Sequence, residues 1–320
     1  MVLRETKLID RIRRMAAGAA INKAVVRGIG DDCAILRVRS GFELLVTTDL
    51  CIEDVHFRRE WHPPQSVGHR CLARGLSDMA AMGGEPLSCF LSLGLPSGLS
   101  QSWVDGFLQG LHDLAQRFKV QLSGGDISSA QQITADIVVV GQAPAGKALL
   151  RSRARPGDRI YVTGDLGGSA AVLRQLYQGK KVKSAKSSRH FYPAPRVEVG
   201  GWLRQKGLAK SMIDLSDGLS VDLAHICEES RVSAIIYEDR VPVAKGAGLS
   251  LALHGGEDYE LLFTAPAKAK LPNGIGGIKV TEIGLIRKRS NYSSAIQILG
   301  ENGKERSLAP LGWEHFRKQG

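Results

Sequence analysis

Six short segments of the chain set a carboxylate among glycine, serine and threonine residues, the surroundings in which proteins bind hard cations. They are GIGDDC (28–33), TTDLCIEDVHF (47–57), LSDMAAMGG (76–84), SGGD (123–126), IDLSDGLS (213–220) and GGEDYEL (255–261). Two bare carboxylates about 4 Å apart repel each other by roughly 4 kcal/mol at the effective dielectric constant of a protein surface. If the segments converge in the fold, a cation must therefore neutralise them.

The residue types in these segments indicate which cation that is. Oxygen ligands without paired cysteine or histidine favour magnesium, calcium or manganese over zinc or copper. Magnesium in turn implies phosphate chemistry, because it keeps several waters and bridges a few carboxylates to substrate phosphates. The chain contains neither a paired-cysteine site nor a nucleophile signature such as GxSxG. Together the six segments favour a metal-phosphate site.

The acids of the first half differ in what each one indicates. Asp31 and Asp32 are consecutive, so their side chains point apart in an extended segment and at most one is a direct ligand. Thr47 and Asp49 alternate along a strand and therefore share one side of it. Asp78 lies in an apolar helix, where a carboxylate must face solvent or be paired with a charge. Taken alone, each acid is also compatible with an ordinary turn or cap.

Three further positions combine an acid with glycine or serine. Asp126 follows two glycines, which let the backbone approach a ligand closely. Asp214, Ser216 and Asp217 combine a strand end, a hydroxyl and a following glycine within a few positions. These positions too are compatible with turn chemistry when each is considered separately.

Two glycine-rich stretches resemble phosphate-binding loops but are better explained otherwise. In residues 141–148, Ala148 stands where a P-loop needs a hydroxyl for magnesium, and Pro144 removes one backbone N–H. Residues 163–169 could hold an anion at the start of a helix. A tight strand-to-helix turn, capped by Asp165 or Ser169, is the favoured interpretation.

Composition limits the class of protein. At 320 residues, with 43% hydrophobic and 23% charged residues, the chain suits a soluble protein of two domains. No apolar run is long enough for a membrane span, and the N-terminus lacks a signal-peptide core, so we expect a cytoplasmic location. The five cysteines form no CxxC pair, which predicts reduced thiols rather than disulfides or a zinc site. A functional role for Cys33 or Cys51 stays open.

The net charge of +11 is compatible with nucleic acid, a membrane surface or anionic small molecules as partners. The basic residues are scattered except in GKKVKSAKSSRH (179–190), which follows an expected helix. A solvated loop is favoured there over an RNA contact, because no aromatic-rich RNA-binding signature accompanies it. We therefore expect neither a nucleic-acid nor a membrane partner.

Helices and strands alternate in both halves of the chain, which predicts an α/β (α+β) protein. We expect helices over residues 3–15, 66–82, 103–118, 169–177 and 196–205, and a strand-turn-helix segment over 212–230. We expect strands over residues 42–48, ending at Asp49, and over 88–96, 133–141, 159–164, 233–238 and 259–266. Turn formers from Pro144 to the stretch RSRARPGD mark the domain boundary.

In this order, and together with ALLRSRARPGD (148–158) and the terminal LGWEHF (311–316), the motifs resemble those of thiamine-monophosphate kinases. That family belongs to a superfamily with aminoimidazole ribonucleotide synthetase, the hydrogenase maturation factor HypE and selenide water dikinase. The resemblance spans almost the whole chain. It implies an ATP- and metal-binding domain over residues 1–142, whose mixed sheet pairs with that of a second copy in a homodimer. It also implies a C-terminal α/β sandwich over 143–320, with ATP and metals between the domains.

The family reaction transfers the γ-phosphoryl group of ATP in line to thiamine monophosphate, with several magnesium ions, and gives thiamine diphosphate. By motif, the implied magnesium ligands are Asp32, Thr47, Thr48, Asp49, Asp78, Asp126, Asp214 and Asp217. The implied ATP contacts are Gly125, Asp126, Arg151 and Ser216, with Asp32 and Thr47 beside the nucleotide. The implied thiamine-phosphate contacts are His56, Glu257 and Trp313. Asp126, Asp78 and Arg151 are the implied catalytic residues.

This reaction agrees with the residue types, because an acceptor that is already an anionic phosphate needs no base, only alignment and charge neutralisation. Selenide water dikinase is disfavoured because no reactive cysteine lies in an N-terminal glycine-rich loop, and aminoimidazole ribonucleotide synthetase is disfavoured by VHF and GGEDYEL. Another ATP-using member of the superfamily and a metal-dependent phosphohydrolase remain as alternatives. One departure stands at Arg74-Gly75, where the family leads us to expect an apolar residue and asparagine; it bears on local packing or a nearby polar contact.

Overall fold

The computed structural model describes residues 5–17, 22–30, 33–182, 188–289 and 295–313, and the chain divides into two compact units. The first unit comprises residues 1–79 and 84–147, and the second comprises residues 80–83 and 148–320. The main boundary, between Lys147 and Ala148, falls within the stretch of turn formers that the sequence marks. No helix of the described residues is both long and apolar enough to cross a bilayer.

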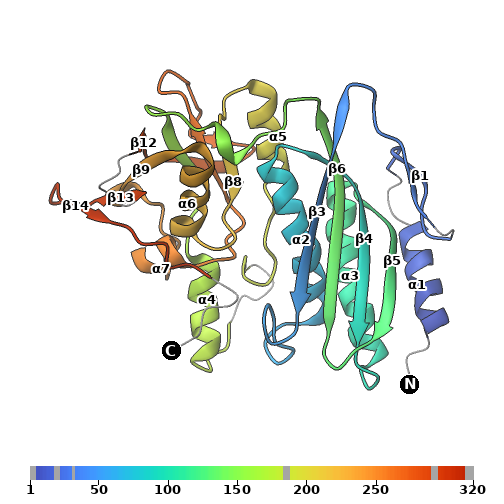
Figure 1. Ribbon diagram of the computed structural model, residues 1–320. Helices are drawn as coiled ribbons and strands as arrows, with labels where there is room; N and C mark the ends of the chain where they lie inside the picture. Colours follow the sequence, from blue (N-terminus) through green and yellow to red (C-terminus); the bar gives the residue numbers. More distant parts are fainter. Residues whose placement is uncertain (1–4, 18–21, 31–32, 183–187, 290–294, 314–320) are drawn as a thin grey trace. The chain divides into compact units, whose positions relative to one another are not determined.

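The first unit is built on a mixed four-stranded sheet, as predicted. Its order is β3-β6-β4-β5, with β4 parallel to β5 and the other neighbours antiparallel (Figure 1). The strands are β3 (Phe42–Ile52), β4 (Glu85–Leu95), β5 (Gln121–Ser129) and β6 (Thr134–Pro144). A separate two-stranded ladder joins β1 (Val25–Arg27) to β2 (Ile35–Leu36).

Two long helices, α2 (Pro64–Ala81) and α3 (Gln101–Phe118), cover one face of this sheet, and α1 (Glu5–Ala17) contacts β5 and α3 (Figure 1). The sequence predicted all three helices. Glycines let α2 and α3 approach closely, because a Cβ at Gly68 would stand 1.8 Å from the Phe107 carbonyl oxygen. The start of α3 is fixed by Ser100, whose side chain accepts the Trp103 N–H.

Two features of this sheet differ from expectation. The strand expected to end at Asp49 continues to Ile52, so Asp49 lies inside β3 rather than at its end. The SGGD segment, for which no strand was expected, lies within β5. At Gly125 the backbone has φ +149°, and a Cβ would stand 1.8 Å from the Leu91 carbonyl oxygen. Only glycine therefore fits this pairing of β5 with β4.

The second unit is built on a larger, mostly antiparallel sheet of order β14-β13-β9-β12-β7-β10-β8, with β11 paired to β12. Among the described strands of this sheet, only β9 and β13 pair in parallel. The strands are β7 (Arg159–Thr163), β8 (Met212–Asp214), β9 (Val232–Tyr237), β10 (Leu261–Ala265), β11 (Gly274–Ile275), β12 (Ile278–Lys288), β13 (Ile296–Leu299) and β14 (Glu305–Ser307).

Strand β12 lies in the middle of this sheet, yet the sequence analysis did not identify it. Its pattern of buried and exposed residues is irregular, and Gly284 interrupts its apolar positions. That glycine is required by the pairing with β9, because a Cβ would stand 2.1 Å from the Ile235 carbonyl oxygen. The contact with β9, which is distant in sequence, therefore requires the glycine that hides the strand pattern of β12.

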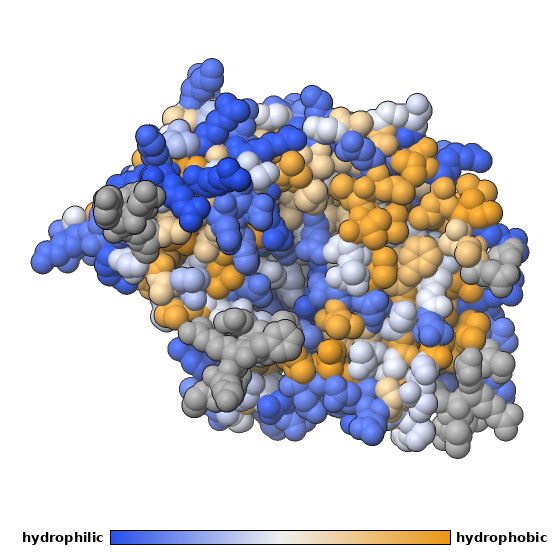
Figure 2. Space-filling view, viewed as in Figure 1, coloured by the Kyte–Doolittle hydropathy of each residue, from blue (hydrophilic) through white to orange (hydrophobic). Residues whose placement is uncertain are grey.

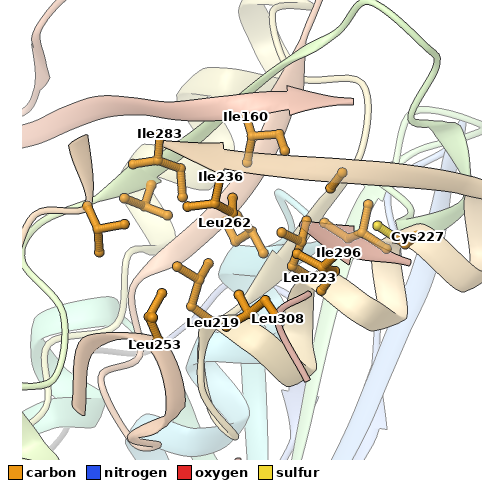
Figure 3. Close-up of a cluster of buried hydrophobic side chains, with 14 of the residues drawn as sticks. Ile160, Leu219, Leu223, Cys227, Ile236, Leu253, Leu262, Ile283, Ile296 and Leu308 are labelled. Carbon is orange, nitrogen blue, oxygen red and sulfur yellow. The ribbon is translucent and has the colours of Figure 1, made fainter. Parts of the chain in front are cut away.

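Helices α4 (Gly168–Tyr177), α5 (Val197–Lys206), α6 (Leu219–Ser230) and α7 (Leu249–His254) complete the second unit, with short 3-10 turns η1 (Arg151–Arg153) and η3 (Glu238–Arg240). The core forms where α6 packs on the sheet (Figure 3). Leu219, Leu223 and Cys227 of α6 belong to the same buried cluster as Ile236 and Leu262. Burying each leucine contributes roughly 1.5–3 kcal/mol, so this cluster anchors the N-terminus of α6.

Neither glycine-rich stretch, 141–148 or 163–169, has the structure of a phosphate-binding loop. No α-helix follows Lys147, and the Gly146 N–H donates to Glu43 Oε2 at 3.1 Å, so the prediction against a P-loop is confirmed. Residues 163–169 form the strand-to-helix turn that was favoured, but its cap differs from the prediction. The Asp258 carboxylate accepts the N–H groups of Gly167 and Ser169, at 2.6 and 3.3 Å.

Candidate functional site

The first set of predicted site residues meets where β3 faces α2. The Thr47 hydroxyl donates to the Asp78 carboxylate, which extends from α2. Asp49, two residues further along β3, is paired with Arg74, one helical turn before Asp78. The expectation that Thr47 and Asp49 share one side of a strand is confirmed, and both contact residues of the same helix.

Thr48 points to the opposite side of β3 and belongs to a second row of polar residues. Its hydroxyl donates to Asp136 Oδ1 at 2.8 Å. The strand register places Asp136 opposite Ser92, and Ser92 opposite Asp126. Asp136 was not predicted from the sequence, although a carboxylate within an apolar strand was a signal for it.

Asp126 and Gly125 line a cavity of 510 Å³ within the first unit. Its other walls include Ile9 and Ile12 of α1, Phe90 of β4, and Gly30 and Cys33. A cavity of this size, mostly apolar with one carboxylate and exposed glycine backbone, is typical of small-molecule sites. The predicted ligand Asp32 lies outside the described residues, as does Asp31.

His56 lies in the turn that follows β3. Its Nδ1 accepts the Ile52 N–H at 3.0 Å, so the neutral ring carries its proton on Nε2. Its carbonyl oxygen accepts from Arg70 at 3.1 Å. The Ile52 N–H therefore fixes the direction of the imidazole, and Arg70 holds the backbone of His56.

In the second unit three motifs that are distant in sequence meet at the end of β8, where Asp214 is buried. The Glu257 N–H donates to the Ser216 carbonyl oxygen at 2.7 Å, and the Trp313 N–H donates to the Asp217 carbonyl oxygen at 3.1 Å. Glu257 has a left-handed backbone, with φ +64°. Trp313 is 44% exposed, so it does not act as a core anchor of the C-terminal tail.

Two further residues at this position were missed by the sequence analysis. Asp222, in the first turn of α6, accepts the N–H groups of Asp217 and Gly218 at 3.2 and 3.0 Å. Burial raises the pKa of Asp222 well above its usual value, and the neighbouring Asp214 and Asp217 raise it further. His225 completes a group with Asp217 and Asp222 whose ligand atoms lie within 4.8 Å of one another. Asp222 and His225 stand three residues apart where a helix was expected, so the sequence already indicated that both lie on one side of that helix.

Arg151 lies apart from this group within the second unit. It belongs to η1, and its carbonyl oxygen accepts from the Ser230 hydroxyl at 2.7 Å, at the last residue of α6. Asp217 precedes the first residue of the same helix, whose 12 residues span about 18 Å. The structure therefore does not bring Arg151 and Asp217 together.

The GGEDYEL motif also carries a buried ion-pair network that holds its backbone in place. Glu260 is fully buried and accepts from Arg196 Nε and Nη2 at 2.7 and 2.5 Å, from the Thr163 hydroxyl at 2.6 Å, and from Arg189. Burial raises the pKa of the nearby Asp258 to about 7, although two backbone N–H bonds oppose the rise. Asp258 and Glu260 hold in place the segment that begins at Glu257.

The groups gathered in the first unit fit a magnesium ion by their chemistry. Thr47, Asp49 and Asp78 offer only hydroxyl and carboxylate oxygens, the donors that magnesium prefers. In the second unit, burial raises the pKa of Asp222 and the neighbouring Asp214 and Asp217 raise it further, so three carboxylates lie together in an arrangement that a cation would stabilise.

Comparison with known proteins identifies relatives over nearly the whole chain. The family models described as AIR synthase related protein match in two parts, the N-terminal domain over residues 30–143 and the C-terminal domain over residues 155–296. The thiamine-monophosphate kinase of Bacillus subtilis (strain 168) is 32% identical, with 96% of this chain and 99% of that protein covered. That of Escherichia coli (strain K12) is 41% identical, with 90% and 91% covered.

Solved structures give the same result. The crystal structure of thiamine-monophosphate kinase from Stenotrophomonas maltophilia K279a is 35% identical with a TM-score of 0.80, covering 93% of this chain and 97% of that one. AaThiL complexed with AMPPCP and TMP is 29% identical with a TM-score of 0.77, covering 98% and 97%. The hydrogenase maturation protein HypE in complex with ATP, at 18% identity and a TM-score of 0.79, shares the fold.

Proposed function

Because this chain belongs to the AIR synthase related family and, within it, to the thiamine-monophosphate kinases, we propose that it phosphorylates thiamine monophosphate. The γ-phosphoryl group of ATP passes to the phosphate of the acceptor, giving thiamine diphosphate and ADP. The observation that carries the proposal is the convergence of Thr47, Asp49 and Asp78 in a chain that matches these kinases almost end to end.

Magnesium is the cation that this proposal requires. The proposed ligands in the first unit are Thr47, Asp49 and Asp78 on one side of β3, Thr48 and Asp126 in the second row of polar residues, and Asp32. In the second unit they are Asp214 and Asp217. When bound, magnesium neutralises the charge of the phosphates, so that two anionic groups can approach each other. The oxygen-only donors Thr47 and Asp78 in the first unit, and the neighbouring carboxylates of Asp214, Asp217 and Asp222 in the second, support this assignment.

The protein's own contribution is to hold groups in fixed directions. The Thr47 hydroxyl orients the Asp78 carboxylate through their hydrogen bond. Gly125 is required by the pairing of β5 with β4, and its exposed backbone is proposed as a contact of ATP. Arg151, through its guanidinium, and Ser216, through its hydroxyl, are proposed as two separate contacts of ATP, because they lie near opposite ends of α6. Because the acceptor phosphate is already ionised, orientation in line is the main catalytic requirement and no side chain has to remove a proton.

The thiamine part of the acceptor carries a cationic thiazolium ring, and the proposed contacts suit a cation. Glu257 supplies a carboxylate on a segment fixed by its bond to Ser216. Trp313 offers a half-exposed indole ring, the aromatic group that attracts a cation most strongly. His56 is proposed as a further contact of the same substrate, with its ring direction fixed by Ile52.

A homodimer formed through the first unit is part of the proposal. The sheet face opposite α2 and α3 exposes Leu44, Val46 and Leu50 of β3, at 49%, 64% and 48% exposure. Figure 2 shows hydrophobic residues gathered over the strands of this sheet. Exposed apolar patches of this kind mark protein-protein contacts, and a second copy of the same face is their proposed partner.

We also propose a cytoplasmic location for the protein, because the proposed reaction uses ATP.

The test is to incubate the purified protein with magnesium and ATP, with and without thiamine monophosphate, and to measure thiamine diphosphate. We expect product only when the acceptor is present. In Asp78→Asn we expect turnover at least about a hundredfold lower, since each fixed electrostatic contact contributes on this scale. Asp113→Asn, at an exposed acid of α3, is the matched control and retains turnover. Release of inorganic phosphate regardless of the acceptor indicates a phosphohydrolase instead, and near-normal turnover in folded Asp78→Asn removes that residue from the site.

A further inference from the structure

Arg74 brings a fixed positive charge into the cluster proposed to hold magnesium. It lies on α2, one turn before Asp78, and its side chain is only 15% exposed. Its Nε and Nη2 donate to the same oxygen, Oδ1 of Asp49, at 2.8 and 2.7 Å. Both contacts are therefore made with one oxygen of the carboxylate.

The charges of this cluster are therefore partly balanced before any metal binds. Asp49 and Asp78 carry two negative charges and Arg74 carries one positive charge, which stays protonated at all relevant pH values. A guanidinium beside a carboxylate in a half-buried position interacts more strongly than an exposed pair, because solvent screens it less. The same positive charge repels a divalent cation that approaches Asp49.

We propose that Arg74 is a built-in counter-cation at the Asp49–Asp78 pair, an inference that rests on the proposed function. It takes the place of part of the charge that a divalent ion would otherwise supply. The two carboxylates can then remain together without metal, and magnesium binds to them less tightly than it would to the bare pair. Because Arg74 contacts Oδ1, the other oxygen of Asp49, Oδ2, is the one proposed to share a cation with Asp78.

The test is to compare magnesium binding by calorimetry, and thermal unfolding in EDTA and in magnesium, for the wild-type protein and Arg74→Gln. We expect Arg74→Gln to bind magnesium about tenfold or more tightly, because one nearby positive charge is removed. We also expect its unfolding temperature in EDTA to fall, and magnesium to raise it by more than in the wild-type protein. Arg74→Lys keeps the charge and should bind magnesium as the wild-type protein does.

Arg39→Gln is the control, since it removes the same charge from an exposed pair with Glu85 in the same unit. It should change neither magnesium affinity nor the response to EDTA. If the wild-type protein binds magnesium and Arg74→Gln binds it no more tightly, the inference is wrong while the proposed function stands. If neither protein binds magnesium, the metal site of the proposed function is wrong and the inference fails with it. Should Arg74→Gln fail to fold even in magnesium, Arg74→Met and Arg74→Lys decide instead. The inference requires tighter magnesium binding by Arg74→Met and wild-type affinity for Arg74→Lys. Wild-type affinity for Arg74→Met, or tighter binding by Arg74→Lys, would overturn it.

Discussion

Replacing Glu260 by glutamine should destabilise the protein strongly, because it leaves a buried guanidinium without its counter-charge. Glu260 is 0% exposed and the side chain of Arg196 is 6% exposed, and two hydrogen bonds of 2.7 and 2.5 Å join them. The neutral amide keeps the shape of the carboxylate but turns donors toward donors. Removing one partner of a buried pair costs about 3–5 kcal/mol, a large part of the roughly 5–15 kcal/mol that stabilises a typical protein.

The assay is urea unfolding followed by circular dichroism, with Glu282→Gln as the matched control. Glu282 also accepts from two arginines, Arg159 and Arg240, at 3.5 and 3.4 Å, but its side chain is 30% exposed. Loss of such a pair changes the free energy of unfolding by about 0–1 kcal/mol. We expect the midpoint of Glu260→Gln to fall several times further than that of the control. Equal shifts for the two variants would refute the reasoning.

A double variant separates lost charge balance from lost packing. In Glu260→Leu with Arg196→Met, both charges of the buried pair are removed together, although Arg189 still loses its partner. Replacement of a whole buried pair by apolar residues is often neutral or stabilising. We therefore expect the double variant to be more stable than Glu260→Gln. If it is less stable, uncompensated charge is not the cause of the loss.

Three further predictions concern other parts of the chain. Folding raises the pKa of Asp258 from 3.8 to about 7, so the folded protein keeps this proton to a higher pH than the unfolded chain does. The contribution of the protonated group to the free energy of unfolding is therefore full below pH 3.8. It is lost as the pH rises to 7, at about 1.4 kcal/mol per pH unit. Unfolding midpoints at pH 5 and pH 7 should therefore fall less with pH in Asp258→Asn than in the wild-type protein, and an unchanged slope would contradict this. Gly125→Ala should lower the unfolding temperature and stop turnover, because its Cβ would stand 1.8 Å from a backbone oxygen, whereas Gly98→Ala, with open space around it, should do neither. Val46→Glu should convert the proposed dimer to a folded monomer in light scattering, and an unchanged mass would show that another face, or none, pairs.

Local patterns in the sequence predicted the elements that position the site. The glycines at 83 and 84 end α2, and Ser100 begins α3, so both helices could be placed from short-range rules. Strand alternation correctly set Thr47 and Asp49 on one side of β3. In these cases the residues that determine the structure are neighbours in sequence.

The features that the sequence analysis missed depend on contacts between distant residues. Asp258 caps α4 from 91 residues away in the chain, and Arg74 reaches Asp49 across 25 residues. The irregular pattern of β12 follows from Gly284, which the neighbouring β9 requires. A single sequence without pairing information gives no rule for such partners, because the same residue types are equally common in turns and on exposed surfaces.

Phosphorus NMR of a mixture of the protein, magnesium, ATP and thiamine monophosphate tests the central claim most directly. The account predicts that the phosphate signal of thiamine monophosphate is replaced by the two coupled signals of a diphosphate ester, in step with conversion of ATP to ADP. It also predicts that inorganic phosphate stays at the level of a protein-free control. Growth of the inorganic phosphate signal while thiamine monophosphate remains unchanged would contradict the account.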